Sequence, residues 1–164
     1  MFYDPHRHPG RCFSCSQNHD FGVRGIQKQW CIFGRSKWDG RTAESIEEAL
    51  RTGNEKALLR YRDGIPLGTV RFTIDVNSLY FFRLSVCPEA RRQGLAKSMP
   101  AWLENYAQEH GIGKIRCSVR KSVPRNIQLY LSAGYSVSCE KTVQSSSGLP
   151  VDIVIMEKDI TRAG

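Results

Sequence analysis

Residues 84–97 read LSVCPEARRQGLAK and join an apolar, strand-like run to the start of an amphipathic helix. Gly94 and Ala96 are small, so a ligand can approach the backbone closely at this junction. The opening turn of a helix leaves several N–H groups without intrahelical partners, and together with the helix dipole these groups bind anions. Three basic side chains flank the junction: Arg91, Arg92 and Lys97. The segment is therefore a candidate phosphate site, with an ordinary glycine-containing loop beside a solvated basic surface as the alternative.

The chain on either side of this junction alternates between helical and strand patterns. Periodicity and cap residues predict helices over 42–53, 94–109 and 124–134. Apolar residues that alternate with polar ones, bounded by turn residues, predict strands over 57–61, 67–74, 79–86, 115–119, 136–143 and 151–157. This order predicts an α+β, or mixed α/β, fold with a mostly antiparallel sheet and one βαβ crossover.

Length and composition set further bounds. The chain has 164 residues, of which 40% are hydrophobic. One domain of that length buries roughly 70% of the surface that the unfolded chain exposes, so it needs neither disulfides nor a metal to fold. The first forty residues show little periodicity beyond a strand expected within 27–33. We therefore expect a poorly defined segment over residues 1–40, followed by a single domain over residues 41–164.

Charge and cysteine content bear on compartment and partners. No apolar run is long enough for a membrane span or a signal peptide. Several of the six cysteines lie inside apolar, strand-like runs, where cysteine acts as a small hydrophobic residue. These features predict a cytoplasmic protein without a membrane partner. The formal charge of +8 predicts a polyanionic partner, which is nucleic acid, an acidic surface or a phosphate-bearing cofactor.

Two short motifs resemble those of the GCN5-related N-acetyltransferase (GNAT) superfamily. Residues 91–96 read RRQGLA and match the family signature (Arg/Gln)-x-x-Gly-x-(Gly/Ala), with a strand before it and a helix after it. Residues 129–135 read LYLSAGY and resemble the second family motif, a helix with Leu-Tyr that ends in Gly-Phe or Gly-Tyr. The resemblance covers about residues 42–160 and implies the GNAT fold, with helices on both faces of the sheet.

The resemblance also implies an acyltransferase that uses acetyl-coenzyme A as cosubstrate and no metal. It assigns the pyrophosphate to the loop residues Arg91, Arg92, Gln93, Gly94, Leu95, Ala96 and Lys97. It assigns the pantetheine arm and the thioester carbonyl to the backbone of Leu84, Ser85 and Val86. Tyr130 is the expected acid for the departing thiolate. A primary amine, on a small molecule or a peptide, is then expected to attack the thioester directly in a ternary complex, without a covalent enzyme intermediate.

The usual general base of the family has no counterpart in the sequence. Many members carry a carboxylate on the central strand, whereas residues 80–83 read YFFR. The base and the acceptor therefore stay unassigned, and an acyl-coenzyme A binder or sensor without turnover is an alternative. The oligomeric state also stays open, with a homodimer through the carboxyl-terminal strands as one alternative.

A basic segment and a cysteine pair suit two different ligands, nucleic acid and zinc. Residues 114–125 carry five positive charges and no acid, which suits a nucleic-acid backbone. Residues 83–97 carry a net charge of +3, so the two segments account for the whole excess and favour one phosphate-rich cofactor over nucleic acid. Cys12, Cys15 and His19 have a spacing that suits zinc, but no second complete pair accompanies them, and we expect no metal site.

Overall fold

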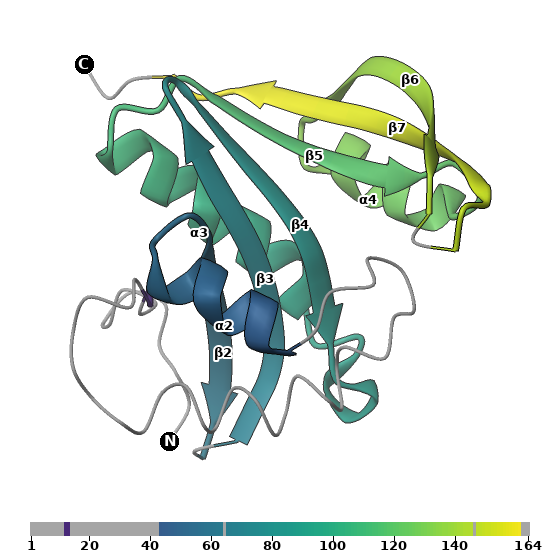
Figure 1. Ribbon diagram of the computed structural model, residues 1–164. Helices are drawn as coiled ribbons and strands as arrows, with labels where there is room; N and C mark the ends of the chain where they lie inside the picture. The colour runs from purple at the N-terminus through teal and green to yellow at the C-terminus, as the bar shows by residue number, and fades with distance from the viewer. Residues whose placement is uncertain (1–11, 14–42, 64, 146, 162–164) are drawn as a thin grey trace. The chain divides into compact units, whose positions relative to one another are not determined.

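Figure 1 shows the protein as a computed structural model, which describes residues 12–13, 43–63, 65–145 and 147–161. The strand expected within 27–33, and Cys15 and His19 of the alternative zinc site, lie outside these residues. The helices are α2 (Ala43–Arg51), the short 3-10 helix η1 (Pro88–Ala90), α3 (Leu95–Glu109) and α4 (Pro124–Ser132). None of these helices is long and apolar enough to cross a membrane. The strands are β1 (Cys12–Phe13), β2 (Lys56–Arg62), β3 (Ile65–Asp75), β4 (Ser78–Val86), β5 (Lys114–Arg120), β6 (Ser136–Gln144) and β7 (Pro150–Asp159).

The strand pairing confirms the predicted mixed α/β fold. Hydrogen bonds connect the strands in the order β1-β2-β3-β4-β5-β7-β6. β4 and β5 run parallel, with Leu79 opposite Ile115 and Phe81 opposite Cys117, and α3 connects them. β7 runs antiparallel to both β5 and β6. The predicted βαβ crossover is therefore β4–α3–β5.

The chain divides into two compact units. The first contains residues 1–71 and 83–96, and the second contains residues 72–82 and 97–164. β3, β4 and α3 each contribute residues to both units. In the first unit, α2 buries Ala49 and Leu50, as its helical pattern predicts.

A buried ion pair joins β3 to the residue that precedes β2 in the first unit. Arg71 is 1% exposed, and its Nε donates a hydrogen bond of 2.9 Å to Oε2 of Glu55. Nη2 of Arg71 donates to the same carboxylate oxygen. Because a buried charge is tolerated only when it is paired, this carboxylate stabilises the guanidinium in its buried position.

Glu55→Ala is expected to destabilise the protein by about 3 kcal/mol, because it leaves Arg71 buried without the Glu55 carboxylate. In a chain of this length such a loss lowers Tm by roughly 6–12 °C, which thermal unfolding followed by circular dichroism would measure. The matched control is Glu48→Ala, which breaks an exposed ion pair with Arg51 and is expected to cost less than about 1 kcal/mol. Equal losses in the two variants would contradict the role of the buried pair.

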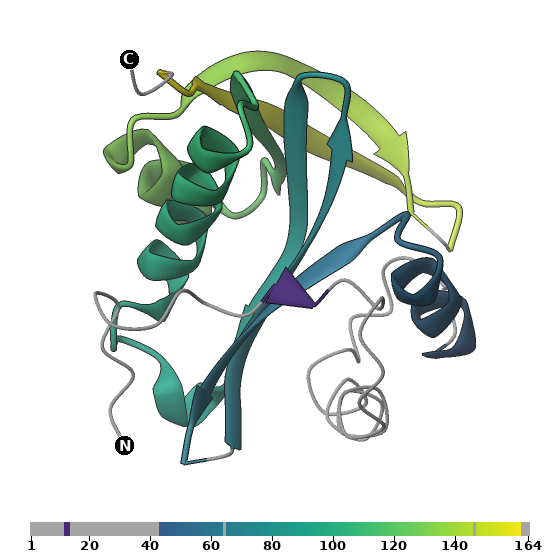
Figure 2. The same cartoon turned by 90° about the vertical axis from the view of Figure 1, so that its left-hand side faces the viewer.

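The second unit packs α3 and α4 on the same side of its strands (Figure 2). β5 buries every second residue, namely Ile115, Cys117 and Val119. The ring of Phe81 on β4 lies 5.7 Å from the ring of Tyr130 on α4, so this face of the strands is the one that the helices cover. α3 adds Met99, Leu103 and Tyr106 to the same core.

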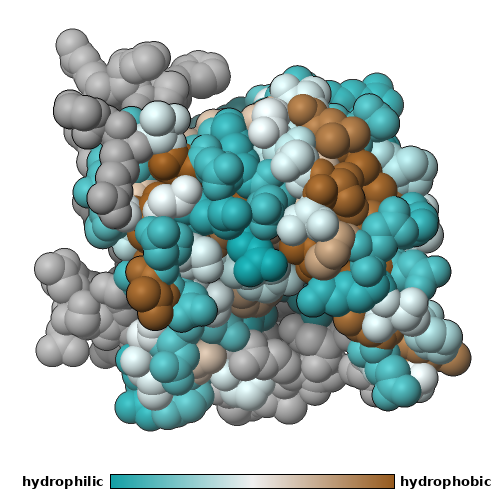
Figure 3. All heavy atoms as spheres, turned by 90° about the horizontal axis from the view of Figure 1, so that it is seen from above, coloured by the Kyte–Doolittle hydropathy of each residue, from teal (hydrophilic) through white to brown (hydrophobic). Residues whose placement is uncertain are grey.

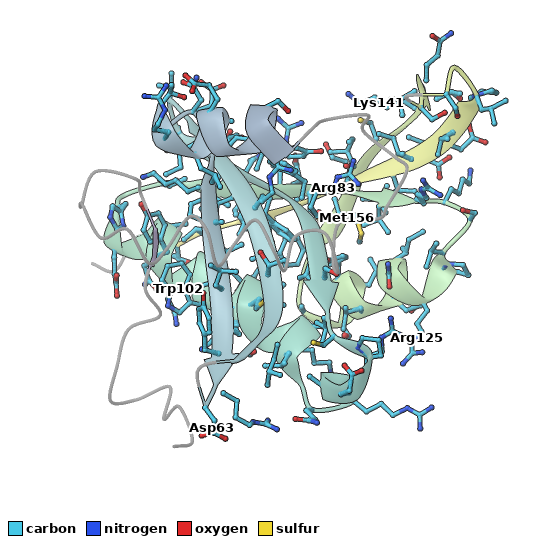
Figure 4. The ribbon with its side chains drawn as sticks, turned by 60° about the horizontal axis from the view of Figure 1, so that its bottom comes forward. Asp63, Arg83, Trp102, Arg125, Lys141 and Met156 are labelled. Carbon is cyan, nitrogen blue, oxygen red and sulfur yellow. The ribbon has the colours of Figure 1, made fainter. Side chains whose placement is uncertain are left out.

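β6 is the last strand in the pairing order of the second unit, and almost all of its residues are exposed. Its pairing with β7 shifts register between Val137 and Cys139, and Lys141, labelled in Figure 4, places a charge on the strand. Register shifts of this kind and lysines hinder the pairing of an edge strand with another chain. The face shown in Figure 3 is mixed, with hydrophobic patches among hydrophilic residues. A homodimer through the carboxyl-terminal strands stays a prediction.

Candidate functional site

The predicted phosphate loop lies in the first unit, between β4 and α3. The backbone leaves β4 at Val86, makes the single turn of η1 and reaches α3 at Leu95. Two residues of the loop adopt the left-handed conformation: Arg92 with φ 63° and Gly94 with φ 79°. This conformation costs a residue with a side chain roughly 1–2 kcal/mol, whereas glycine adopts it freely. The glycine of the signature therefore fits this backbone conformation without the penalty that Arg92 carries.

Gln93 holds the loop from its centre. Its Nε2 donates a hydrogen bond of 3.1 Å to the carbonyl oxygen of Glu89. Its Oε1 accepts a hydrogen bond of 2.6 Å from Nη2 of Arg62 on β2. Because both ends of the amide are bonded within the first unit, the Gln93 side chain fixes the shape of the loop. The sequence motif identifies the position but does not reveal this function.

The backbone N–H groups of this loop suit an anion. In the described part of the chain, no acceptor is found for the N–H groups of Arg92, Gln93, Gly94 and Ala96. A Cβ atom at Gly94 would meet no described atom within 4 Å, so there is room for a ligand beside it. The first turn of α3 has no acidic residue to neutralise the positive end of the helix dipole. These features fit a phosphate group at this turn.

The strand before the loop has an irregular backbone. Its parallel pairing with β5 ends at Phe81 and Cys117, although β4 continues to Val86. Arg83, labelled in Figure 4, has a positive φ of 56°, which is uncommon for a residue with a side chain. The next three residues are partly exposed: Leu84, Ser85 and Val86. A strand that leaves its neighbour can present backbone groups to a ligand, so this geometry suits the role that the family resemblance implies.

Tyr130 lies in the second unit, near the end of α4. It is 7% exposed and belongs to an aromatic cluster, with ring centroids 5.7 Å from Phe81 and 5.6 Å from Tyr135. Burial, with the nearby Cys117 as a smaller cause, raises the pKa of the Tyr130 hydroxyl above its usual value of about 10. The hydroxyl therefore keeps its proton at neutral and moderately alkaline pH, as a general acid must.

Lys158 on β7 holds the end of the helix that carries Tyr130. Its Nζ donates hydrogen bonds of 2.9 Å to the carbonyl oxygen of Ala133 and 2.7 Å to Oε2 of Glu104 on α3. The carbonyl oxygen of Tyr130 accepts the N–H groups of Ala133 and Tyr135, both at 3.0 Å. One lysine thus joins β7, α3 and the last turn of α4. Sequence reasoning missed Lys158, because its two partners lie 25 and 54 residues away along the chain.

The residues predicted for the cofactor occupy one continuous segment, from the end of β4 through the loop to the start of α3. Lys97 and Tyr130 belong to the second unit, and the other predicted site residues belong to the first. Among the residues that the structure describes, no group of three or more His, Cys, Asp and Glu side chains is placed to hold a metal ion. The functions of the predicted residues stay predictions.

Comparison with known proteins identifies the family. The sequence profile of the acetyltransferase (GNAT) family matches residues 24–135. The chain therefore belongs to the GNAT family of acetyltransferases, as the two motifs predicted, and it is an acyltransferase. No individual curated protein matches the chain in sequence.

Solved structures of acetyltransferases share the fold of this chain. The ribosomal-protein-S18-alanine N-acetyltransferase from Escherichia coli has a TM-score of 0.73 and 18% identity, covering 94% of this chain and 96% of that chain. The spermidine N-acetyltransferase from Vibrio cholerae, solved in complex with CoA and spermine, has a TM-score of 0.72 and 15% identity, covering 93% and 96%. These similarities confirm the predicted GNAT fold.

Proposed function

We propose that the protein is an N-acetyltransferase that transfers the acetyl group of acetyl-coenzyme A to a primary amine. The observation that carries this proposal is the loop of the first unit, where the family signature, a left-handed Gly94 and N–H groups without described acceptors coincide. A pyrophosphate suits the loop because N–H groups and the flanking Arg91 and Arg92 neutralise its charge. Membership of the GNAT family, and a neighbour of the same fold in complex with CoA, support the same cosubstrate.

Each predicted residue has a function in a direct transfer. The loop residues and Lys97 bind the pyrophosphate, and the backbone of residues 84–86 binds the pantetheine arm and stabilises the oxyanion that forms when the amine attacks. The new bond joins the amine nitrogen to the carbonyl carbon, and the bond from that carbon to sulfur breaks. The sulfur leaves with the electron pair and takes the proton of Tyr130. The amine loses its extra proton to water, and the Tyr130 phenolate recovers a proton from water.

Two of the described cysteines, Cys87 and Cys117, support direct attack. The thiolate is the nucleophilic form of cysteine, so a catalytic cysteine needs a lowered pKa. Burial instead raises the pKa of Cys117 to about 12. Burial and the neighbouring Glu89 also raise the pKa of Cys87. Neither thiol is prepared to form an acetyl-enzyme, so we propose that the amine attacks the thioester itself.

Two assays test the proposal, the first of ligand binding and the second of turnover. Acetyl-coenzyme A is expected to raise the Tm of the purified protein, whereas single- and double-stranded oligonucleotides are not. The reverse result would replace the proposal by a nucleic-acid function. A panel of primary amines, assayed by release of the free thiol, then separates an acetyltransferase from a binder, because an acyl-coenzyme A sensor would bind without releasing thiol above the rate of hydrolysis.

Lys158→Met is expected to lower kcat about 10-fold while changing the Kd for coenzyme A less than about 2-fold. The substitution removes the hydrogen bond to the Ala133 carbonyl, so the last turn of α4 and Tyr130 lose a fixed position. A displacement of even 1 Å at a reacting group costs up to about 100-fold in rate. Steady-state kinetics and titration calorimetry would measure the two effects.

A double-mutant cycle shows whether Lys158 acts through Tyr130. In a Tyr130→Phe background, Lys158→Met is expected to cause no further loss of kcat, because the group that it positions is gone. Lys121→Met is the matched control, since it likewise removes a lysine but breaks only an ion pair with Glu140 between exposed side chains. Additive losses in the double variant would show that Lys158 affects the rate by another route.

A further inference from the structure

The strands of the second unit carry a polar face on the side away from α3 and α4. On β5, the residues that alternate with the buried ones are Lys114, Arg116, Ser118 and Arg120. The register places Tyr80 of β4 and Glu157 of β7 on either side of Arg116. Tyr80 stacks on Phe82, with ring centroids 5.7 Å apart, and its hydroxyl lies 2.7 Å from Oγ of Ser118. We use "polar face" for the surface formed by the following residues of these strands: Tyr80, Phe82, Lys114, Arg116, Ser118, Arg120, Glu157 and Asp159.

Arg116 stands at the centre of the polar face, where the described residues leave part of its hydrogen-bonding capacity unused. Its guanidinium has five N–H donors, and its buried Nε has no hydrogen-bond partner among the described residues. Its Nε lies 3.8 Å from Oε2 of Glu157, which is an ion pair but exceeds hydrogen-bond distance. Glu157 is instead bound by Lys114, whose Nζ lies 3.2 Å from Oε1, and this hydrogen bond is the main cause that lowers the pKa of Glu157. The Arg116 side chain as a whole is 42% exposed, so its terminal N–H groups can bind a further anion.

The position of Arg116 connects it to the proposed reaction. It precedes Cys117, which with Phe81 forms the last pair between β4 and β5. Tyr130 contacts Phe81 on the helix-covered face, where the leaving sulfur would receive its proton. Because α4 occupies that face, the polar face is the side from which an acceptor amine can reach the point where the strands part.

The charges of the polar face disfavour a polycationic acceptor. Three cations of β5 stand beside only two carboxylates of β7, namely Glu157 and Asp159. Both carboxylates already lie within 4 Å of Lys114. An acceptor with several ammonium groups would therefore find, among the described residues of this face, no carboxylate that is not already paired.

We infer that Arg116 determines acceptor specificity by binding a carboxylate of the acceptor, which is a small molecule with a primary amine near that carboxylate. A planar guanidinium binds a carboxylate through two parallel hydrogen bonds, and this geometry fixes orientation as well as affinity. The stacked rings of Tyr80 and Phe82 provide an apolar surface beside it for the carbon skeleton. The inference rests on the proposed acetyltransferase function and adds the class of acceptor.

Matched pairs of amines test the inference. The pairs are lysine and 1,5-diaminopentane, ornithine and 1,4-diaminobutane, and phenylalanine and 2-phenylethylamine, which differ only in the carboxylate; spermidine and phosphoethanolamine complete the panel. With saturating acetyl-coenzyme A, at least one carboxylate member is expected to show kcat/KM at least about 10-fold above its partner. Arg116→Gln is expected to lower that value about 10- to 100-fold, as for the loss of a charge-assisted pair, and to leave the partner amine unchanged. For the same carboxylate amine, kcat/KM of Arg116→Lys is expected to lie between the values of the parent protein and of Arg116→Gln.

Lys141→Gln is the matched control, because it removes an exposed cation from β6 without touching Arg116. Preference for spermidine or phosphoethanolamine, equal use of both members of every pair, or equal losses in Arg116→Gln and Lys141→Gln would each overturn the inference. If no amine is acetylated, thermal shifts with coenzyme A bound decide: carboxylate amines must raise Tm of the parent protein and not of Arg116→Gln. Failure of coenzyme A itself to bind would instead reject the proposed function, independently of Arg116.

Discussion

Gly94→Val is expected to weaken binding of coenzyme A by roughly 100-fold or more while the protein stays folded. Gly94 has a φ of 79°, a conformation that a β-branched residue adopts only with strain. The new side chain would also occupy the space beside the N–H groups of the loop, where no described atom lies within 4 Å of a Cβ. Loss of two charge-assisted hydrogen bonds to phosphate, at about 1.5–3 kcal/mol each, weakens binding by roughly 100-fold or more. Titration calorimetry with coenzyme A measures this loss.

Gly53→Val separates the loss of binding from the strain. Gly53, in the turn after α2, has a φ of 78° and likewise no described atom within 4 Å of a Cβ. The two valine variants are therefore expected to lower Tm by similar amounts, since the backbone penalty is the same. Only Gly94→Val is expected to lose the ligand. Retained affinity in Gly94→Val, or an equal loss in Gly53→Val, would remove the loop from its proposed function.

The sequence predicts a helix or strand well wherever its apolar residues keep one regular spacing from end to end. The helix predicted over 94–109 is α3, Leu95–Glu109, and the strand predicted over 115–119 is β5, Lys114–Arg120. β1 and η1 were not predicted, because two or three residues are too few to show a regular spacing of apolar residues. The helix predicted over 124–134 ends earlier, at Ser132, because residues 133 and 134 form the turn that closes it.

The site divides in the same way between local and long-range information. The loop could be located because its signature contains a glycine, which the sequence analysis explained by close approach of a ligand. The left-handed conformation of Gly94 was not predicted. The left-handed Arg83 and Arg92 carry no comparable signal, since residues with side chains rarely adopt this conformation. Partners such as Glu104 for Lys158 depend on folding segments far apart in the chain, and a single sequence does not contain them.

Tyr130→Phe is expected to lower kcat about 100-fold while the Kd for coenzyme A changes less than about 2-fold. A positioned general acid contributes roughly 10²- to 10⁴-fold, and the phenol oxygen is the only atom removed. Tyr135→Phe is the matched control, because its ring lies in the same cluster, 5.6 Å from Tyr130, and is 3% exposed. An equal loss of kcat in Tyr135→Phe would assign the effect to packing of the cluster instead of proton transfer.

The pH dependence of kcat gives Tyr130 a second, independent test. A general acid must hold its proton, so its activity is lost as the pH rises through its pKa. Because burial raises the pKa of Tyr130 above about 10, this loss is displaced to higher pH, and kcat is expected not to fall through Tyr130 between about pH 7 and 9.5. A decline with a midpoint below about pH 9 that disappears in Tyr130→Phe would show that the hydroxyl titrates in a polar setting. In that case, Tyr130 would not be buried against Phe81 and Tyr135 when it acts as the acid during turnover.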